Sequence, residues 1–160
     1  MSSRTAALRR GLDELALVLA PEAQEKLLAY VELLAKWNKT YNLTAIRDPL
    51  QMITHHLLDS LAVLPHLPPG TLADVGSGAG LPGIPLAIAE PARRVTLNDI
   101  NQKKAAFLRQ AVMELKLANA DVHLGRAQDW RPAQPFACVI TRAFAELADF
   151  IAACRHLLAP

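Results

Sequence analysis

Several classes of protein are excluded by what the sequence has little of. Only two cysteines occur in 160 residues, so we expect no disulfide-rich scaffold and interpret Cys138 and Cys154 as small core residues. No apolar run reaches the ~18 residues that span a bilayer, and charges inside the first helical stretch argue against a signal peptide. The formal net charge of +2 neither demands nor excludes a nucleic-acid partner. We therefore expect a cytoplasmic protein that binds no membrane and no metal.

The first part of the chain has helical periodicity. Apolar residues recur at helical spacing over Glu22–Lys39, and Pro21 stands where a helix can begin without losing a needed N–H. Similar patterns predict helices over about Thr5–Leu19 and over residues 49–64. Two consecutive prolines and a glycine then break the pattern. We therefore predict that residues 1–66 form an N-terminal helical cap.

After this break, short runs rich in β-branched residues alternate with helical stretches. The strand-like runs are TLADV, RVTLN, DVHLG and FACVIT, which begin at residues 71, 94, 121 and 136. The helical stretches cover residues 86–90, 102–117 and 145–158. Strands separated by helices indicate a parallel sheet with helices on both faces. Residues 67–160 are therefore predicted to form a Rossmann-like α/β domain.

A glycine-rich loop follows the first strand-like run. Residues 74–83 read DVGSGAGLPG, with four glycines in eight positions. Ligands of open parallel sheets bind beyond the carboxyl ends of the strands, and glycine lets the backbone approach them closely. A tight turn without a ligand is the alternative. The loop lacks a dinucleotide-binding fingerprint, because Leu81 stands where that motif has its third glycine.

The spacing D-x-G-x-G-x-G instead resembles the first motif of class I methyltransferases, which bind S-adenosylmethionine. Asp99 follows at the end of the second strand-like run, 23 residues beyond Gly76. An acid there can accept hydrogen bonds from both ribose hydroxyls, or alternatively cap the next helix. After the third run, Ala127 and Gln128 are candidates to hold the adenine ring.

Four segments together resemble one family. These are WNKTYNLTAI (37–46), HHLLDSL (55–61), DVGSGAGLPGIPLAI (74–88) and TRAFAEL (141–147). They resemble the RsmG family, also called GidB, of bacterial 16S rRNA guanine-N7 methyltransferases. The resemblance implies a class I fold, S-adenosylmethionine as cofactor, 16S ribosomal RNA or the small ribosomal subunit as partner, and methyl transfer to guanine N7.

The resemblance also implies roles for individual residues. The implied cofactor contacts are Asp74, Gly76, Gly78, Gly80, Leu81, Asp99, Ala127, Gln128 and Arg142. The residues implied to face the cleft where the methyl group and guanine meet are Asn42, His56, Asp59 and Arg142. Each of these four has a structural alternative: capping a helix for Asn42 and Asp59, packing against the sheet for His56, and pairing with an acid for Arg142. Three positions depart from the family pattern, namely Asn98, Gln128 and Ala137.

The implied reaction needs few catalytic groups. Guanine N7 has an exposed lone pair and no proton, so its attack on a sulfonium methyl requires alignment and exclusion of water rather than a general base. A carboxylate such as Asp59 would stabilise the positive charge left on the base. The RNA itself would be bound through its phosphates by cations. Our candidates for this role are Arg9, Arg10, Lys36, Lys39 and Arg142.

The strands of the family do not all occur in this sequence. The resemblance implies further strands after the fourth, but the chain ends at RHLLAP. We therefore expect the sheet to look truncated after its fourth strand, whose edge would be unpaired and prone to self-association. A non-catalytic module that binds S-adenosylmethionine or the ribosome is thus one alternative function. An NAD-dependent oxidoreductase is the other.

Overall fold

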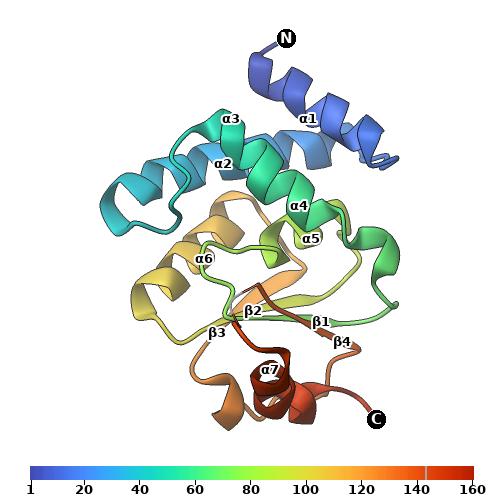
Figure 1. Cartoon of the computed structure of the whole chain (residues 1–160), viewed down its shortest axis with the longest axis vertical. Helices are drawn as coiled ribbons and strands as arrows, with labels where there is room; N and C mark the ends of the chain where they lie inside the picture. Colours follow the sequence, from blue (N-terminus) through green and yellow to red (C-terminus); the bar gives the residue numbers. More distant parts are fainter. Residues whose placement is uncertain (143) are drawn as a thin grey trace.

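The computed structural model describes residues 1–142 and 144–160. Its centre is a parallel sheet in the order β3-β2-β1-β4. The strands are β1 (Leu72–Val75), β2 (Val95–Asp99), β3 (Ala120–Leu124) and β4 (Cys138–Ile140). Figure 1 shows helices above and below this sheet. The predicted Rossmann-like sheet, with helices on both faces, is confirmed.

Three helices belong to the α/β part. α5 (Gly83–Ala89) and α6 (Gln102–Glu114) cover one face, and α7 (Leu147–Cys154) covers the other (Figure 1). α5 begins three residues earlier than its pattern predicted, since the amide of Gly83 already donates to the Asp74 carboxylate. α6 ends at Glu114 rather than at residue 117, because Lys116 takes the left-handed conformation at φ 53°. The expected last helix is α7 followed by the 3₁₀ turn Arg155–Leu157.

The predicted helical cap is also present. It contains α1 (Ser3–Glu14), α2 (Pro21–Tyr41) and a third rod made of α3 (Pro49–Met52), the π-helical turn Ile53–Leu58 and α4 (Asp59–Leu61), before the 3₁₀ turn Leu64–His66. Pro21 is the first residue of α2, as expected. α1 stops well before Leu19, because Ala16 has a positive φ of 55°. π-helical turns are frequently found at functional sites, and this one contains His56.

One hydrophobic core joins the cap to the sheet. Leu27 and Leu57 of the cap are fully buried together with Ile84, Leu97 and Phe107 of the α/β part. A smaller cluster on the opposite face contains Ala73, Val75, Ala127, Trp130, Phe136, Ala153, Cys154 and Leu157. Residues 1–66 and 67–160 therefore share one hydrophobic core on the face where they meet.

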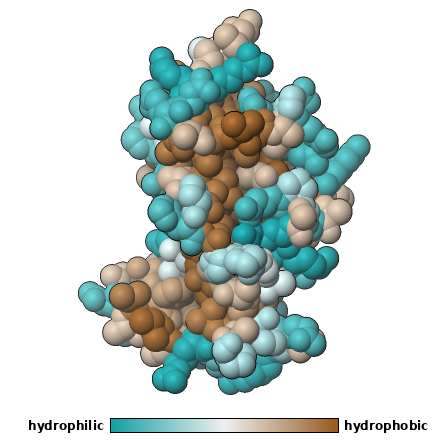
Figure 2. All heavy atoms as spheres, turned by 90° about the vertical axis from the view of Figure 1, so that its right-hand side faces the viewer, coloured by the Kyte–Doolittle hydropathy of each residue, from teal (hydrophilic) through white to brown (hydrophobic). Residues whose placement is uncertain are grey.

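The sheet ends at β4, as expected. β4 pairs with β1 on one side, and within the described part of the chain only an isolated bridge between Phe136 and Leu158 lies beyond it. Figure 2, which views the molecule from the right of Figure 1, shows a vertical apolar band between hydrophilic flanks. On α7, Leu147 and Ile151 are exposed.

The cap is fixed to the glycine loop by a buried tyrosine. Tyr30 of α2 is completely buried, and its hydroxyl donates to the carbonyl oxygen of Ala79 at 2.5 Å. Tyr30→Phe removes the donor and leaves a buried carbonyl without this partner. We expect the free energy of unfolding, measured by urea denaturation, to fall by about 1–3 kcal/mol.

The matched control is Tyr41→Phe on the same helix, because the Tyr41 side chain is exposed. We expect this change to alter the free energy of unfolding by no more than about 0.5 kcal/mol. Equal effects of the two substitutions would contradict a stabilising role for the bond between Tyr30 and Ala79.

Candidate functional site

Two carboxylates hold the glycine loop between β1 and α5. The Asp74 Oδ2 atom accepts from the Ser77 hydroxyl at 2.6 Å and from the Gly83 amide at 2.8 Å. The Asp99 Oδ2 atom, at the end of β2, accepts from the Gly78 amide at 2.8 Å. The loop is therefore anchored from inside β1 and from the neighbouring strand.

The glycines of this loop are required for two different reasons. Gly76, Gly78 and Gly80 have φ values of 68°, 59° and 91°, which side chains rarely adopt. A Cβ on Gly78 would still meet open space, with its nearest atom at 4.0 Å, whereas a Cβ on Gly83 would overlap Asp74 and Leu97. Gly83 thus lets α5 pack closely on the sheet, and the backbone around Gly78 is open to a ligand.

A cavity of about 260 Å³ lies beyond the carboxyl ends of β1, β2 and β3. It brings together four residues that the sequence predicted as cofactor contacts: Gly76, Asp99, Ala127 and Gln128. The lining residues that sequence reasoning did not name as contacts are Val75, Asn98, Ile100, Gly125, Arg126 and Phe144. Ile100 and Phe144 make part of the wall apolar, and Asp99 is its only carboxylate among the described lining residues.

Asp99 accepts bonds from two backbone amides and does not cap α6. Its Oδ1 atom accepts from the Asn101 amide at 2.8 Å, while its Oδ2 atom accepts from Gly78. The N-cap of α6 is Asn101, whose side chain accepts from the Lys104 amide at 3.0 Å. Because a carboxylate offers about four acceptor sites, Asp99 retains capacity for two further donors.

The other implied cofactor residues do not line this cavity. Asp74 is fully buried in β1, and Leu81 is buried in the core. Gly80 faces Ile84 of α5, since a Cβ there would overlap that side chain. These residues shape the loop from beneath.

A second group of predicted residues lies on the cap side. The Arg142 guanidinium lies 3.6 Å from the Asp59 carboxylate, and both side chains are exposed. The hydroxyl of the neighbouring Thr141 donates to the Val75 carbonyl at 2.7 Å, which fixes this segment beside the end of β1. The pairing of Arg142 with an acid was one of the structural alternatives.

His56 is buried, and both of its ring nitrogens have partners. Nδ1 donates to the His55 carbonyl at 3.2 Å, so in the neutral ring Nε2 accepts from the Thr44 hydroxyl at 2.8 Å. Burial, followed by the positive charge of Arg142, lowers the pKa of His56 below its ordinary value. The imidazole is therefore neutral at pH 7 and fixes the loop that contains Thr44.

The side chain of Asn42 bonds to Arg47 and not to Asp59 or Arg142. Asn42 ends α2 in the left-handed conformation at φ 50°, and its side-chain oxygen accepts from Arg47 at 2.9 Å. This agrees with the capping alternative for Asn42. Asp59 ends the π-helical turn, where its backbone N–H donates to the His56 carbonyl, but within the described residues its side chain makes no capping hydrogen bond.

Sequence reasoning did not identify the role of Asn98, although this polar residue in an apolar strand was noted as unusual. Its Nδ2 atom donates to the Gly125 carbonyl at 2.9 Å, and its own carbonyl accepts from the Ser77 amide at 2.8 Å. Asn98 thus ties the glycine loop to the loop after β3. The polar residue itself was the available signal.

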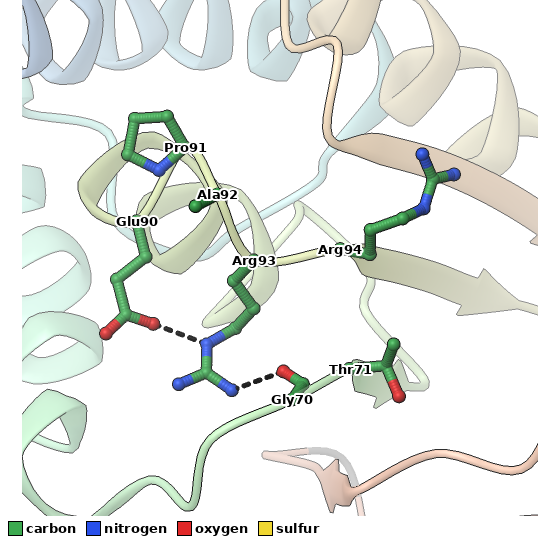
Figure 3. A pocket seen from close by; sticks show the side chains of 7 residues that line it. All are labelled: Gly70, Thr71, Glu90, Pro91, Ala92, Arg93 and Arg94. Atoms are coloured by element: carbon green, nitrogen blue, oxygen red, sulfur yellow. Dashed lines mark hydrogen bonds and ion pairs between the residues drawn. The ribbon is translucent and has the colours of Figure 1, made fainter.

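A different hollow, of about 520 Å³, lies at the opposite edge of the sheet (Figure 3). Arg93 there pairs with Glu90 and donates to the carbonyls of Pro68 and Gly70. These contacts hold together two loops that precede β1 and β2. Because ligands of parallel sheets bind at the carboxyl ends of strands, we assign this hollow no part in the site.

Asp74 has no cation among its hydrogen-bond partners. Burial raises its pKa to about 7, although the hydrogen bonds from Ser77 and Gly83 oppose this rise. Between pH ~4 and ~7 the folded chain therefore holds one proton more than the unfolded chain. The free energy of unfolding should fall as the pH rises through this window, by on the order of 4 kcal/mol.

Urea denaturation at a series of pH values measures this effect. Asp74→Asn cannot titrate, so we expect the variant to lose that part of the pH dependence while the contributions of all other groups remain. If the wild-type chain and Asp74→Asn have the same slope between pH 4 and 7, Asp74 does not titrate there.

Among residues 1–142 and 144–160, no helix has the length and apolar character needed to cross a bilayer. In the same residues, no group of three or more His, Cys, Asp or Glu side chains is arranged to hold a metal ion.

The fold is similar to those of solved methyltransferases. A SAM-dependent methyltransferase from Geobacter sulfurreducens in complex with S-adenosyl-L-homocysteine superposes with a TM-score of 0.54 at 20% identity, over 78% of this chain and 51% of that chain. One from Thiobacillus denitrificans, with the same ligand, gives 0.54 at 19% identity over the same shares of the two chains. The class I methyltransferase fold is therefore confirmed.

Relatives with known names cover most of the chain. Ribosomal RNA small subunit methyltransferase G of Methylobacillus flagellatus is 58% identical over 152 residues, which are 95% of this chain and 74% of the relative. The protein of the same name from Pseudomonas paraeruginosa is 54% identical over 151 residues, or 94% and 71%. The model of the GidB family, described as rRNA small subunit methyltransferase G, matches residues 23–160. The chain belongs to the GidB family.

Proposed function

We propose that this protein transfers a methyl group from S-adenosylmethionine to N7 of a guanosine in 16S ribosomal RNA, in the cytoplasm. The observation that carries the proposal is the cavity at the carboxyl ends of β1, β2 and β3, where Gly76, Asp99 and Ala127 meet. Relatives more than 50% identical are named as methyltransferases of small-subunit ribosomal RNA. Solved proteins of the same fold contain S-adenosyl-L-homocysteine.

The residues of the cavity fit the adenosine part of the cofactor. Asp99 has acceptor sites left for the ribose hydroxyls, and the apolar Ile100 and Phe144 offer surfaces to a flat base. A volume of about 260 Å³ is smaller than that of usual small-molecule clefts, which are about 300–1,000 Å³. We therefore assign the cavity to adenosine and the open backbone around Gly78 to the methionine part.

The cofactor supplies an electrophilic methyl group on a sulfonium. The protein must place guanine N7 in line with that group and exclude water, and such positioning can contribute about 7–11 kcal/mol. The exposed pair of Asp59 and Arg142 lies beside the end of β1, because the neighbouring Thr141 bonds to Val75. We propose that Asp59 stabilises the positive charge that methylation leaves on the base. His56 would position the loop after α2 through its bond with Thr44.

The two alternative functions are less well supported. An NAD-dependent enzyme is disfavoured because the glycine spacing is that of methyltransferases, with Leu81 in place of the third glycine. A non-catalytic module is not favoured by the relatives, of which this chain covers 71–74%. Calorimetric titration with S-adenosylmethionine and with NAD, followed by methyl transfer onto small-subunit RNA, tests all three functions. Borohydride reduction followed by aniline-induced scission of the RNA reports N7 methylation.

Asp99→Asn tests the cofactor site. Amidation removes the negative charge and one acceptor oxygen that faces the cavity. We expect the Kd for S-adenosylhomocysteine, measured by calorimetry, to rise at least about 10-fold, since hydrogen bonds to charged groups contribute about 1.5–3 kcal/mol. Asp13→Asn, an exposed change on α1, is the control and should leave the Kd unchanged. If wild type and Asp99→Asn bind a 2′,3′-dideoxy analogue equally well, the loss is due to the ribose contacts. If Asp99→Asn leaves the Kd for S-adenosylhomocysteine unchanged, Asp99 does not contact the cofactor.

Asp59→Asn tests the assignment of charge. A partly exposed charge pair is worth about 1 kcal/mol, so we expect kcat for RNA methylation to fall about 5-fold while the Kd for S-adenosylhomocysteine stays constant. Asp59→Glu retains the charge and should recover part of the rate. An unaltered methylation rate in Asp59→Asn would remove Asp59 from the mechanism.

A further inference from the structure

The carboxy-terminal end of α2 has a surface that the cofactor site does not use. We call it the α2-end surface and define it by Lys36, Lys39, Tyr41 and Arg47, all of which are exposed. It lies between two hollows, one of about 550 Å³ toward α1 and α3 and one of about 390 Å³ toward α6. Lys36 lines both hollows, so they flank one continuous ridge.

The charge of this surface is positive and not neutralised. The larger hollow is lined by four cations and by one carboxylate, Glu32, which pairs with Arg4 at 3.5 Å. Among the described residues, Lys36, Lys39 and Arg47 form no ion pair. In that part of the chain, the only side-chain hydrogen bond of the three is from Arg47 to the Asn42 oxygen. Uncompensated cations in a groove are complementary to a phosphate backbone.

An aromatic ring stands at the same place. The Tyr41 side chain is 43% exposed, although its ring stacks on Trp37 with centroids 5.1 Å apart and an angle of 30° between the planes. Trp37 in turn contacts the buried Phe107 at 5.6 Å. The Tyr41 ring therefore packs on the core through Trp37 and is also exposed to solvent. On the α6 side of the smaller hollow, the Glu114 carboxylate accepts from Gln110 at 2.6 Å.

The loop after α2 joins this surface to the candidate active site. Asn38 accepts from the Thr44 amide at 2.9 Å, and the Thr44 hydroxyl donates to His56, which lies in the charge environment of Arg142. Figure 1 shows the end of α2 and the carboxyl ends of the strands on the same, left-hand side. A strand of nucleic acid can therefore contact both regions.

We propose that the α2-end surface binds single-stranded RNA next to the target guanosine, with Lys36, Lys39 and Arg47 on phosphates and Tyr41 stacked on a base. Positive grooves with exposed aromatic rings are the common device for single strands, and a base inside a duplex cannot stack on a protein ring. As a statement about the substrate strand, this rests on the proposed function.

Binding of a labelled single-stranded RNA 12-mer to the full chain tests the proposal. The variant Lys36→Gln/Lys39→Gln loses two cations of the surface. We expect the slope of log affinity against log salt to become shallower by about 1.4, since each phosphate contact on a single strand contributes about 0.7. The control Arg94→Gln/Arg155→Gln removes the same charge at exposed positions outside this surface and should leave the slope unchanged.

Tyr41 separates stacking from charge. Tyr41→Ala should weaken binding of the 12-mer about 10-fold, and Tyr41→Phe should stay within about 2-fold of wild type because the ring remains. Thermal melting of each variant verifies the fold. Four results would each overturn the proposal. The surface and control variants could lose the same affinity, or Tyr41→Ala could bind the 12-mer as tightly as wild type. The wild type could bind a 12-bp duplex as tightly as the single strand, or bind no RNA at all.

Parallel measurements of cofactor binding and RNA methylation keep the two proposals distinguishable. If wild type methylates RNA and the surface variants bind the 12-mer normally, the α2-end surface is refuted and the proposed function stands. If the surface variants alone lose the 12-mer but wild type neither binds the cofactor nor methylates, the surface stands and the proposed function fails.

Discussion

The site depends on a carboxylate that is buried without a cation among its hydrogen-bond partners. Asp74 bonds Ser77 and Gly83, so a single side chain fixes both ends of the glycine loop and the start of α5. Burial in the core makes its ionised form costly, and this cost is the reason for its raised pKa. With the loop fixed in this way, the Gly78 amide points at Asp99 and the cavity beside Gly76 has its shape.

The helical cap is part of the same rigid unit. α2 is held to the glycine loop by the bond from Tyr30 to Ala79 and to the following loop by the bonds of Asn38 with Thr44 and Ile46. α2, the glycine loop and β2 therefore meet in one packed core, which contains Leu34, Leu81 and Leu97. These elements carry residues that would meet RNA and residues that would hold the cofactor. Because packed cores deform little, the relative position of the two ligands is set before either binds.

Sequence periodicity predicted the strands and the main helices because each of these elements shows its own apolar pattern. The predicted ends of α1 and α6 were wrong. Ala16 and Lys116 take a left-handed conformation there, which the sequence composition does not predict. The glycine loop was predicted from its spacing. The bonds that shape it were not, since Tyr30 and Ala79 are 49 residues apart. Asn98 was visible only as an anomaly, because its partners on the next strand lie 25 or more residues away.

The proposed chemistry accounts for how the ionisable groups are distributed. A reaction that moves no proton at the base needs no side chain poised to titrate beside it. Accordingly, Asp74 lies beneath the loop, and His56 is neutral with both nitrogens engaged. Asp99 bonds backbone amides at the cavity edge, where its remaining acceptor sites suit hydroxyl groups. The charges assigned to the RNA, Asp59 with Arg142 and the cations of the α2-end surface, are exposed, so a charged, mobile RNA strand can reach them.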